Sequence, residues 1–440
     1  MKSPLICLVV MVKNEADNVR ALLESARPHV DDVCVTDTGS TDGTQDIVRE
    51  TLGNPAKLYE TRPIMARLRR SDREVFDFAA NRNFALDLAE QGHPPATPQN
   101  ILNKPTFTLF LSGHETLHVE DDTLRKFLLE HRDAPDGAYC VQMRAGARAW
   151  PFTRVLRVSA GWRYHGKRHE CPIGLGGESK GPLIPGVSIV HAPPAEDRER
   201  KIARLRDEDL PIFEDTVEDD SLTLEQRSTA MLFLAETHML LAVDYIEQRG
   251  GKLDKIEPGS PWLSHQMAAM ALYWRYAQIG EQPGRPGYSP EKVHYAIAQY
   301  YSIAGQIPGL YTHEEIARRL KLLAEQAAPK MPELRWLFAS HLAKHAEEIN
   351  SVPDLKMALY HAIEAAKLAR QARLEPTNYE VSETNIEWRG LLLAADCAEV
   401  LGKMADSKEE QVLKASQARK LYEAAAKAGA PKRASEAGAG

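Results

Sequence analysis

Two polar clusters near the start of the chain have the residue types and spacing of a ligand site. The first is residues 13–15 (KNE), and the second is residues 37–44 (DTGSTDGT). A carboxylate such as Asp37, at the end of a buried strand, is held in place and can accept N–H groups from a flat base. Gly39 and Gly43 let the backbone turn tightly and approach a ligand closely. Together these residues indicate a site for a nucleotide-like ligand.

The elements that position both clusters follow from the apolar pattern. Leu5 to Val10 is an apolar run typical of a buried strand, and an amphipathic helix follows with apolar positions at Val19, Leu22 and Leu23. Val33 to Val35 is a second apolar strand. Strand, helix and strand in this order predict a βαβ unit with a parallel sheet. Ligands bind at the carboxyl ends of such strands, where both clusters fall.

The two clusters together resemble one known family. VMVKNE (residues 10–15) and VTDTGSTDGT (residues 35–44) are similar, in order and spacing, to the opening of family 2 glycosyltransferases. These enzymes have the GT-A fold and transfer a sugar from a nucleotide donor. The resemblance implies a donor-binding set of Val12, Lys13, Asn14, Glu15, Asp37, Gly39, Ser40 and Asp42. For Ser40 and Thr41 the alternative is capping of a helix predicted from Gln45 to Thr51.

A predicted helix from Phe76 to Glu90 carries a second part of the resemblance. Its sequence, FDFAANRNFALDLAE, is similar to a family helix that supports the donor site. The resemblance implies that Arg82 and Asn83 contribute to donor binding. The alternative is that both side chains only solvate one face of the helix.

A third polar cluster, residues 112–115 (SGHE), follows a strand predicted from Thr106 to Leu111. The family has its metal-binding Asp-x-Asp signature here, but this chain has Ser112 and His114 in place of the aspartates, so two ligands that suit Mg²⁺ or Mn²⁺ are missing. Ser112 and Gly113 stay candidates for donor contact. Three hypotheses remain: an altered Mn or Mg site, protein cations that offset the diphosphate without metal, and a site without activity. The candidate metal ligands are His114, Glu115 and His191. His191 ends a strand predicted from Ile189, and its alternative is a strand-end residue without a role.

A one-sided basic stretch runs from Ala138 to His169. It contains seven Lys and Arg residues and no Asp or Glu, and parts of it alternate as two strands would, at residues 138–144 and 152–158. The charge indicates an anionic ligand, either the donor diphosphate or a nucleic-acid acceptor whose bases stack on interleaved aromatic residues. The alternative is ordinary strand chemistry, with aromatic side chains inside and arginine outside.

The basic stretch ends in residues 166–170 (GKRHE), which resemble a family element of the form G-x-x-H-E near the acceptor. Inverting sugar transfer needs a carboxylate that takes the acceptor proton. Glu170 is the first candidate for this base, with His169 positioning it or the donor phosphates and Arg168 on the donor side. Glu115 is the reserve candidate.

From about Glu196 the chain is predicted to form successive amphipathic helices divided by Gly/Pro loops. The predicted helices are residues 228–248, 263–279, 290–304, 313–327, 333–346, 355–373, 383–401 and 407–428. Paired helices in series indicate an α-solenoid. The helix near Thr229 is similar to tetratricopeptide-like helices that follow the catalytic domain in some bacterial and phage family 2 enzymes. We therefore expect a GT-A domain at 1–195, a tetratricopeptide-like domain at 196–428 and a disordered tail at 429–440.

Length and composition fit a two-domain protein. The chain has 440 residues, which is long for one domain, and we find no apolar run near the ~20 residues of a membrane span. Five scattered cysteines, an odd number, favour a reducing cytoplasm over a disulfide framework. The start enters a strand directly, so no signal peptide is expected. A net charge of −7 gives no global indication of a polyanionic partner.

Two classes of function follow from these patterns. The first is an enzyme that transfers a sugar from a nucleotide donor, a UDP-sugar by expectation, to a hydroxyl of a macromolecular acceptor. That acceptor is a protein or peptide, or a hydroxymethylated base in phage DNA. The second class is an inactive GT-A scaffold that binds a nucleotide or a partner without chemistry, and the missing Asp-x-Asp is its main support.

Overall fold

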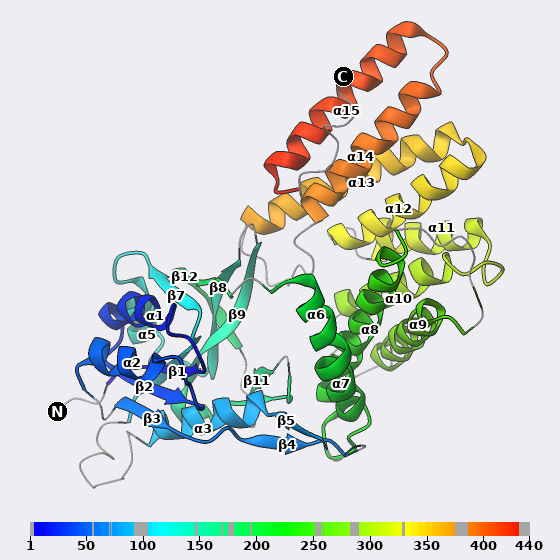
Figure 1. Cartoon of the computed structure of the whole chain (residues 1–440). Coiled ribbons are helices and arrows are strands. Elements are labelled where there is room, and N and C mark those ends of the chain that lie inside the picture. Colours follow the sequence, from blue (N-terminus) through cyan, green and yellow to red (C-terminus); the bar gives the residue numbers. More distant parts are fainter. Residues whose placement is uncertain are drawn as a thin grey trace. The chain divides into compact units, whose positions relative to one another are not determined.

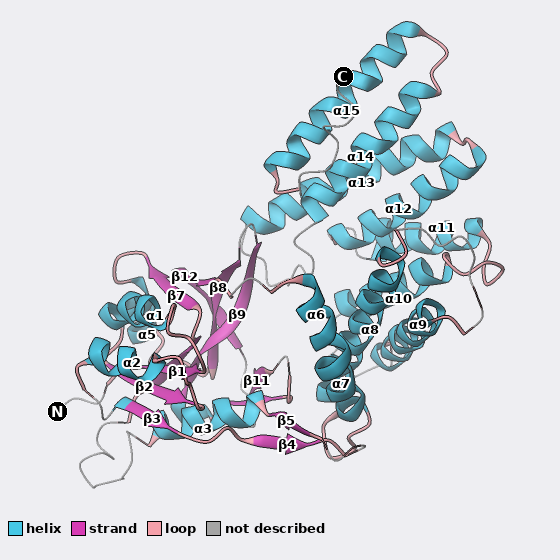
Figure 2. Ribbon diagram, in the orientation of Figure 1, coloured by secondary structure: helices cyan, strands magenta, loops and turns pink. Residues whose placement is uncertain are grey.

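The computed structural model divides into two compact units, formed mainly by Met1–Thr216 and by Val217–Glu375 with Val381–Gly440. The structure describes residues 4–54, 57–69, 71, 73–91, 104–145, 148–168, 170–174, 180–193, 196–250, 257, 259–281, 290–327, 331–374 and 386–430. The sheet lies in the first unit, and the described elements of the second are helices (Figure 2). The expected order, an α/β part followed by an all-helical part, is confirmed.

An eight-stranded sheet organises the described part of the first unit, with the strand order β3-β2-β1-β6-β9-β8-β12-β7. The strands are β1 (Ile6–Val12), β2 (Asp32–Asp37), β3 (Leu58–Glu60), β6 (Phe107–Ser112), β7 (Glu115–Val119), β8 (Ala138–Ala145), β9 (Arg148–Arg157) and β12 (Lys180–His191). β1 pairs in parallel with β2 and β6, and β2 pairs in parallel with β3. β9 runs antiparallel to β6 and β8. This sheet is the mostly parallel, GT-A-like sheet that the sequence predicts.

Helices cover both faces of the sheet (Figure 1). α1 (Val19–Ala26) and α5 (Thr123–Glu130) contribute to the core on one face, and α3 (Phe78–Glu90) contributes to the core on the other. Alternate residues of β1 belong to these two cores, because successive side chains of a strand point to opposite faces. A strand buried on both sides is apolar throughout, and that is why β1 is visible in the sequence. A 3₁₀ turn, η1 (Arg27–His29), and α2 (Thr44–Leu52) complete the opening βαβα segment.

Two small antiparallel sheets were not predicted. One pairs β4 (Met65–Arg67) with β5 (Glu74–Phe76), and the other pairs β10 (Arg163–His165) with β11 (Cys171–Ile173). Each strand has only three residues, which is too short for a visible alternation of polar and apolar residues. The second sheet flanks the segment that carries Glu170.

A helical segment after the sheet belongs to the first unit. It consists of α6 (Arg198–Arg204), the π-helix η4 (Leu205–Asp209) and α7 (Leu210–Val217). Ile212 of α7 forms a small core with Leu68 and Val75, next to β4 and β5. The division between the units therefore falls after Thr216, later than the change of composition at Glu196 indicates.

The second unit is a series of helices in its described residues. They are α8 (Leu224–Glu247), α9 (Pro261–Gly280), α10 (Pro290–Ala304), α11 (His313–Leu322), the π-helix η5 (Leu323–Ala327), α12 (Pro332–Ile349), α13 (Val352–Leu374), α14 (Ile386–Lys403) and α15 (Lys408–Lys427). Consecutive helices pack on one another, for example α8 on α9 and α13 on α14. The predicted helices are confirmed, although the predicted start of the seventh, at Glu383, and most of the predicted tail lie outside the described residues.

Local sequence explains where these helices begin and how closely they pack. Thr223 with Gln226 and Thr312 with Glu315 form capping boxes at the starts of α8 and α11. Gly390 of α14 lies so close to α13 that a Cβ atom there would come within 2.7 Å of the Ala362 carbonyl oxygen. Small residues therefore set the distance between these two helices.

One helix in the described part of the chain is long and apolar enough to cross a membrane by length and composition. It spans Gln226–Glu247, and half of its apolar window is buried within the structure. It packs against α9, as the core helix of a helical array does. This is weak evidence for a membrane span.

Candidate active site

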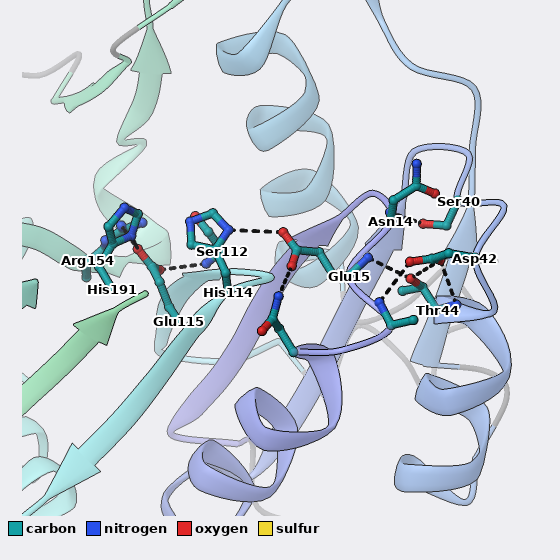
Figure 3. Close-up of polar contacts among 12 residues, drawn as sticks. Asn14, Glu15, Ser40, Asp42, Thr44, Ser112, His114, Glu115, Arg154 and His191 are labelled. Carbon is teal, nitrogen blue, oxygen red and sulfur yellow. Dashed lines mark hydrogen bonds and ion pairs between the residues drawn. The ribbon is translucent and has the colours of Figure 1, made fainter. Parts of the chain in front are cut away.

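The loops after β1 and β2 are joined by hydrogen bonds (Figure 3). The Asn14 amide donates to Ser40 Oγ at 2.8 Å, and the Thr41 amide donates to Asn14 Oδ1 at 2.9 Å. The Ala16 amide donates to Asp42 Oδ2 at 3.0 Å. Asn14 has a positive φ of 56°, which asparagine tolerates better than most residues. Ser40, Asp42 and the Asn14 side chain thus shape the loops, in addition to any contact with a ligand.

Asp37 ends β2 as a fully buried carboxylate. Its Oδ1 accepts hydrogen bonds from the amides of Gly39 and Ser40 and from Gln45 Nε2, each at 2.9 Å. Its Oδ2 is buried and has no hydrogen-bond partner in the described part of the chain. A buried acceptor without a partner costs free energy. Oδ2 of Asp37 is therefore available to accept a hydrogen bond from an N–H group of a ligand.

Val12 and Lys13 differ in what they can offer a ligand. The Val12 side chain is buried, and its carbonyl oxygen already accepts from the Thr38 amide at 3.0 Å and from Thr38 Oγ1 at 3.2 Å. Lys13 is exposed at the strand end. Of these two predicted residues, only Lys13 has a side chain free to reach a donor.

The third cluster lies beside the first, as the sheet order requires. Glu15 Oε1 is 3.1 Å from His114 Nδ1, and a Cβ atom on Gly113 would come within 2.3 Å of Glu15 Cγ. Glycine is therefore the residue that lets Glu15 cross the end of β6. Ser112 contributes its amide, which donates to Glu115 Oε2 at 2.7 Å (Figure 3).

Glu115 has no exposed side-chain surface and three polar partners. Its Oε1 accepts from Arg154 Nη2 at 2.6 Å and lies 3.1 Å from His191 Nδ1, and its Oε2 accepts from the Ser112 amide. Burial raises the pKa of this carboxyl, but the Arg154 guanidinium and the hydrogen bonds from His191 and Ser112 outweigh burial and lower the pKa to about 2. Glu115 is therefore a carboxylate at neutral pH.

The three candidate metal ligands do not form a metal-binding group. The His114 and His191 rings meet edge to face at 4.7 Å between centroids, but His114 Nδ1 faces Glu15 and the carboxylate of Glu115 faces Arg154. No group of three His, Cys, Asp or Glu side chains suited to a metal occurs among the residues that the structure describes. A guanidinium at 2.6 Å from the only carboxylate of the set competes with a divalent cation. The donor set, as placed, does not fit Mn²⁺ or Mg²⁺.

Arg154 was not among the predicted site residues. It is the extra residue of a β-bulge in β9, because Tyr139 pairs with Val155 whereas Cys140 pairs with Thr153. Bulges re-aim side chains and are frequent beside active sites. Arg154 is 6% exposed, and its Nε and Nη1 have no hydrogen-bond partner within the described residues. The basic character of the stretch was the only sequence signal for it.

Glu170 forms a second buried ion pair with arginine. Its Oε1 lies 2.5 Å from Arg82 Nε, and the Arg82 guanidinium lies over the rings of Phe110 and Tyr164 at 4.7 and 5.2 Å from their centroids. These contacts fix the carboxylate on the α3 side of the sheet. Arg82 thus supports the predicted base directly, through an ion pair that sequence reasoning did not foresee.

The structure places the other predicted residues of this region in different surroundings. These residues are Asn83, Arg168 and His169. The Asn83 amide pairs with the backbone of Tyr164 in both directions, at 2.9 and 2.8 Å, which holds β10 on α3. Arg168 Nε is 2.8 Å from Asp209 Oδ1, and its guanidinium covers the ring of Phe78. His169 lies outside the described residues. Asn83 and Arg168 therefore build the site's scaffold, and neither side chain is free toward a donor.

The basic stretch is not a continuous cationic surface. Arg163 pairs with Asp87 and Glu90, Lys167 with Asp215, and Arg168 with Asp209, all at 2.8 Å. Two of its aromatic residues, Trp162 and Tyr164, are 3% and 1% exposed in the core against α3. The expectation that these two rings stack on nucleic-acid bases is wrong, because folding buries them.

A cavity of about 590 Å³ lies elsewhere, beside the start of β6. Its lining includes Glu90, Thr106 and Arg163. The candidate site is at the other end of β6, after Ser112, where β1 and β2 also end. This cavity is therefore on the opposite edge of the sheet from the site.

The comparison with family models agrees with this geometry. Residues 7–176 match the model described as glycosyl transferase family 2, and no curated protein matches the chain. The matched segment includes β1, β2, β6 and β9 and every candidate residue except His191. Enzymes of this family use nucleotide-sugar donors, often with a divalent metal. Residues 7–176 of the first unit are therefore similar to a family 2 glycosyltransferase domain.

Proposed function

We propose that this domain transfers a sugar from a UDP-sugar to a hydroxyl of a macromolecular acceptor, with inversion at the anomeric carbon. The observation that carries the proposal is Asp37, whose buried Oδ2 has no partner among the described residues while Oδ1 is fixed by three donors. The free oxygen suits an N–H group on the edge of a base. The family match supports sugar transfer as the chemistry.

Glu170 is the base in this proposal. It removes the proton from the acceptor hydroxyl as the oxygen attacks the anomeric carbon. The bond between that carbon and the phosphate oxygen breaks, and the nucleoside diphosphate leaves with the bonding electrons. Glu115 is the poorer candidate, because a carboxyl with a pKa of about 2 is too weak a base near neutral pH.

The helical unit is proposed to recruit the acceptor. Helical arrays of the tetratricopeptide-like type present extended surfaces to partners. A protein or peptide hydroxyl is the acceptor that we favour. The alternative, a hydroxymethylated base in phage DNA, rested on the basic stretch. Four of the seven cations in that stretch are paired with carboxylates.

The test measures nucleotide binding and donor hydrolysis together. We expect UDP to bind more tightly than GDP or TDP in calorimetry, and UDP-sugars to be hydrolysed slowly without acceptor. Asp37→Asn should weaken UDP binding roughly 10- to 100-fold, because the amide cannot offer two charged oxygens. The control is Asp46→Asn on the exposed face of α2, where the carboxylate forms an ion pair with Arg49.

The outcome also separates the enzyme from an inactive scaffold. Nucleotide binding without any donor hydrolysis, with a broad set of UDP-, GDP- and TDP-sugars, would favour the scaffold. No binding of any nucleoside diphosphate would overturn the proposal altogether.

A further inference from the structure

A nucleoside diphosphate brings negative charge that some cation must offset. In this chain Ser112 and His114 stand where the family has its metal-binding aspartates. Two carboxylates lie beside them. Glu15 accepts a hydrogen bond from Asn18 Nδ2 at 2.9 Å and faces His114 Nδ1. Glu115 is occupied by Arg154, by His191 and by the Ser112 amide. A divalent cation would have to displace the guanidinium to reach this carboxylate. The charge compensation therefore has to come from another group.

Arg154 has the properties that such a group needs. It is buried and carries a permanent charge. Within the described residues, Nη2 is its only nitrogen with a polar partner, which is Glu115. Its Nε and Nη1 are buried donors without partners in the described part of the chain. Buried donors of a charged group are costly when they are unpaired, so their persistence indicates a missing acceptor. The guanidinium geometry suits two phosphate oxygens at once.

Its place in the sheet agrees with this role. From Asp37 on β2 the strand order runs through β1 and β6 to β9, a distance of three strand spacings or about 14 Å. A nucleoside diphosphate whose base contacts Asp37 extends across that distance with its phosphates toward β9. The bulge at Arg154 breaks the alternation of β9 and turns the guanidinium toward Glu115, at the edge where β6 ends.

We propose that Arg154 takes the place of the divalent cation and binds the diphosphate of the donor through Nε and Nη1. The proposal rests on the function proposed above and names the residue that makes metal-free donor binding possible. Glu115 then acts as a positioning residue, because it holds the guanidinium at the sheet edge. During transfer, the same guanidinium stabilises the negative charge that develops on the leaving diphosphate.

The first test is UDP binding to the full chain by calorimetry, with EDTA and with added Mn²⁺. The affinity should be the same in both conditions. Arg154→Gln should weaken UDP binding about 10- to 100-fold, the loss expected for hydrogen bonds from a charged group, and should leave uridine binding unchanged, because uridine has no phosphate. Arg144→Gln is the matched control, an exposed arginine on the neighbouring strand β8.

The variant Glu115→Gln distinguishes a metal site from a site in which Arg154 binds the diphosphate. If Glu115 is a metal ligand, this variant loses UDP affinity. If Arg154 binds the diphosphate, the variant keeps its affinity, since the glutamine carbonyl still accepts a hydrogen bond from Arg154. This measurement also serves if Arg154→Gln fails to fold.

Two results would overturn the inference while the proposed function stands. One is UDP binding that EDTA abolishes and Mn²⁺ restores, and the other is wild-type UDP affinity in a folded Arg154→Gln protein. A wild-type chain that binds neither UDP, GDP nor TDP and hydrolyses no donor would instead overturn the proposed function, and this inference with it.

Discussion

Two buried glutamate–arginine pairs occur among the residues of the first unit that the structure describes. Their carboxylates differ in the number of partners that they have within this part of the chain. Glu115 has three, from Arg154, His191 and Ser112, and its side chain is 0% exposed. Glu170 has an ion pair with Arg82, and its side chain is 9% exposed. The partners of Glu115 lower the pKa of its carboxyl to about 2, whereas Glu170 is the proposed base. The same pair of residue types can thus serve either electrostatics or proton transfer.

The largest effect is expected on the rate of sugar transfer, from a substitution in the Glu170–Arg82 pair. Glu170→Gln should lower the rate of sugar transfer roughly 10²- to 10⁴-fold, the usual contribution of a general base. UDP affinity should stay within about twofold, because Glu170 is not in the donor-binding set. Turnover with saturating donor and acceptor is the measurement. Full activity in this variant would remove Glu170 as the base.

The Glu115–Arg154 pair should contribute more to the stability of the first unit than the Glu170–Arg82 pair. Glu115→Ala leaves the Arg154 guanidinium buried without its carboxylate, and we expect the free energy of unfolding of the first unit to fall by about 3–5 kcal/mol. Urea denaturation of the full chain reports this loss. Replacing both partners, by Glu115→Leu with Arg154→Met, should recover much of it, and a double variant as unstable as Glu115→Ala would contradict this account.

The depressed pKa of Glu115 predicts how stability depends on pH. Its pKa is about 2 in the folded chain, against an ordinary value of 4.5. The folded state therefore holds fewer protons, and the stabilisation is complete above about pH 5.5 and is lost as the pH falls toward 2. The shift corresponds to about 3 kcal/mol. The difference in unfolding free energy between wild type and Glu115→Gln should shrink between pH 5.5 and 3, and a constant difference would contradict the assignment.

The smallest effect is expected for an exposed pair of the same chemistry. Arg20 Nη2 and Glu50 Oε2 are 2.7 Å apart, but their side chains are 43% and 70% exposed. Such pairs contribute about 0–1 kcal/mol. Glu50→Ala should therefore change the urea midpoint little, and a loss as large as that of Glu115→Ala would show that burial is not the deciding variable.

The sequence predicted the elements that carry strong periodicity. β1, β2 and β6 are buried on both faces and are visible as apolar runs, and the long helices of the second unit are visible through their amphipathic pattern and Gly/Pro loops. The sequence pattern did not predict the short strands β4, β5, β10 and β11 or the segment α6–α7. The attachment of that segment to the first unit depends on pairs such as Lys167 with Asp215, which are distant in sequence.

The positions of the candidate residues could be predicted where these residues lie at the end of a strand. Asp37, Glu15 and Ser112 were placed at the carboxyl edge by the βαβ pattern, and the structure brings them to neighbouring strands. The prediction could not assign partners. Whether Glu115 faces a metal or Arg154, and whether Trp162 stacks on a ligand or lies in the core, depends on which strands become neighbours.

By itself, then, the sequence determined the family resemblance, the order of an α/β part before a helical part, and the strand-end residues at 13–15, 37–44 and 112–115. Local patterns suffice for these, because periodicity and turn residues act over a few positions. The tertiary structure alone decided that Arg154 is re-aimed by a bulge toward Glu115 and that Arg82 holds Glu170. The physical reason is that register and side-chain pairing are set by packing between distant segments, which no local pattern records.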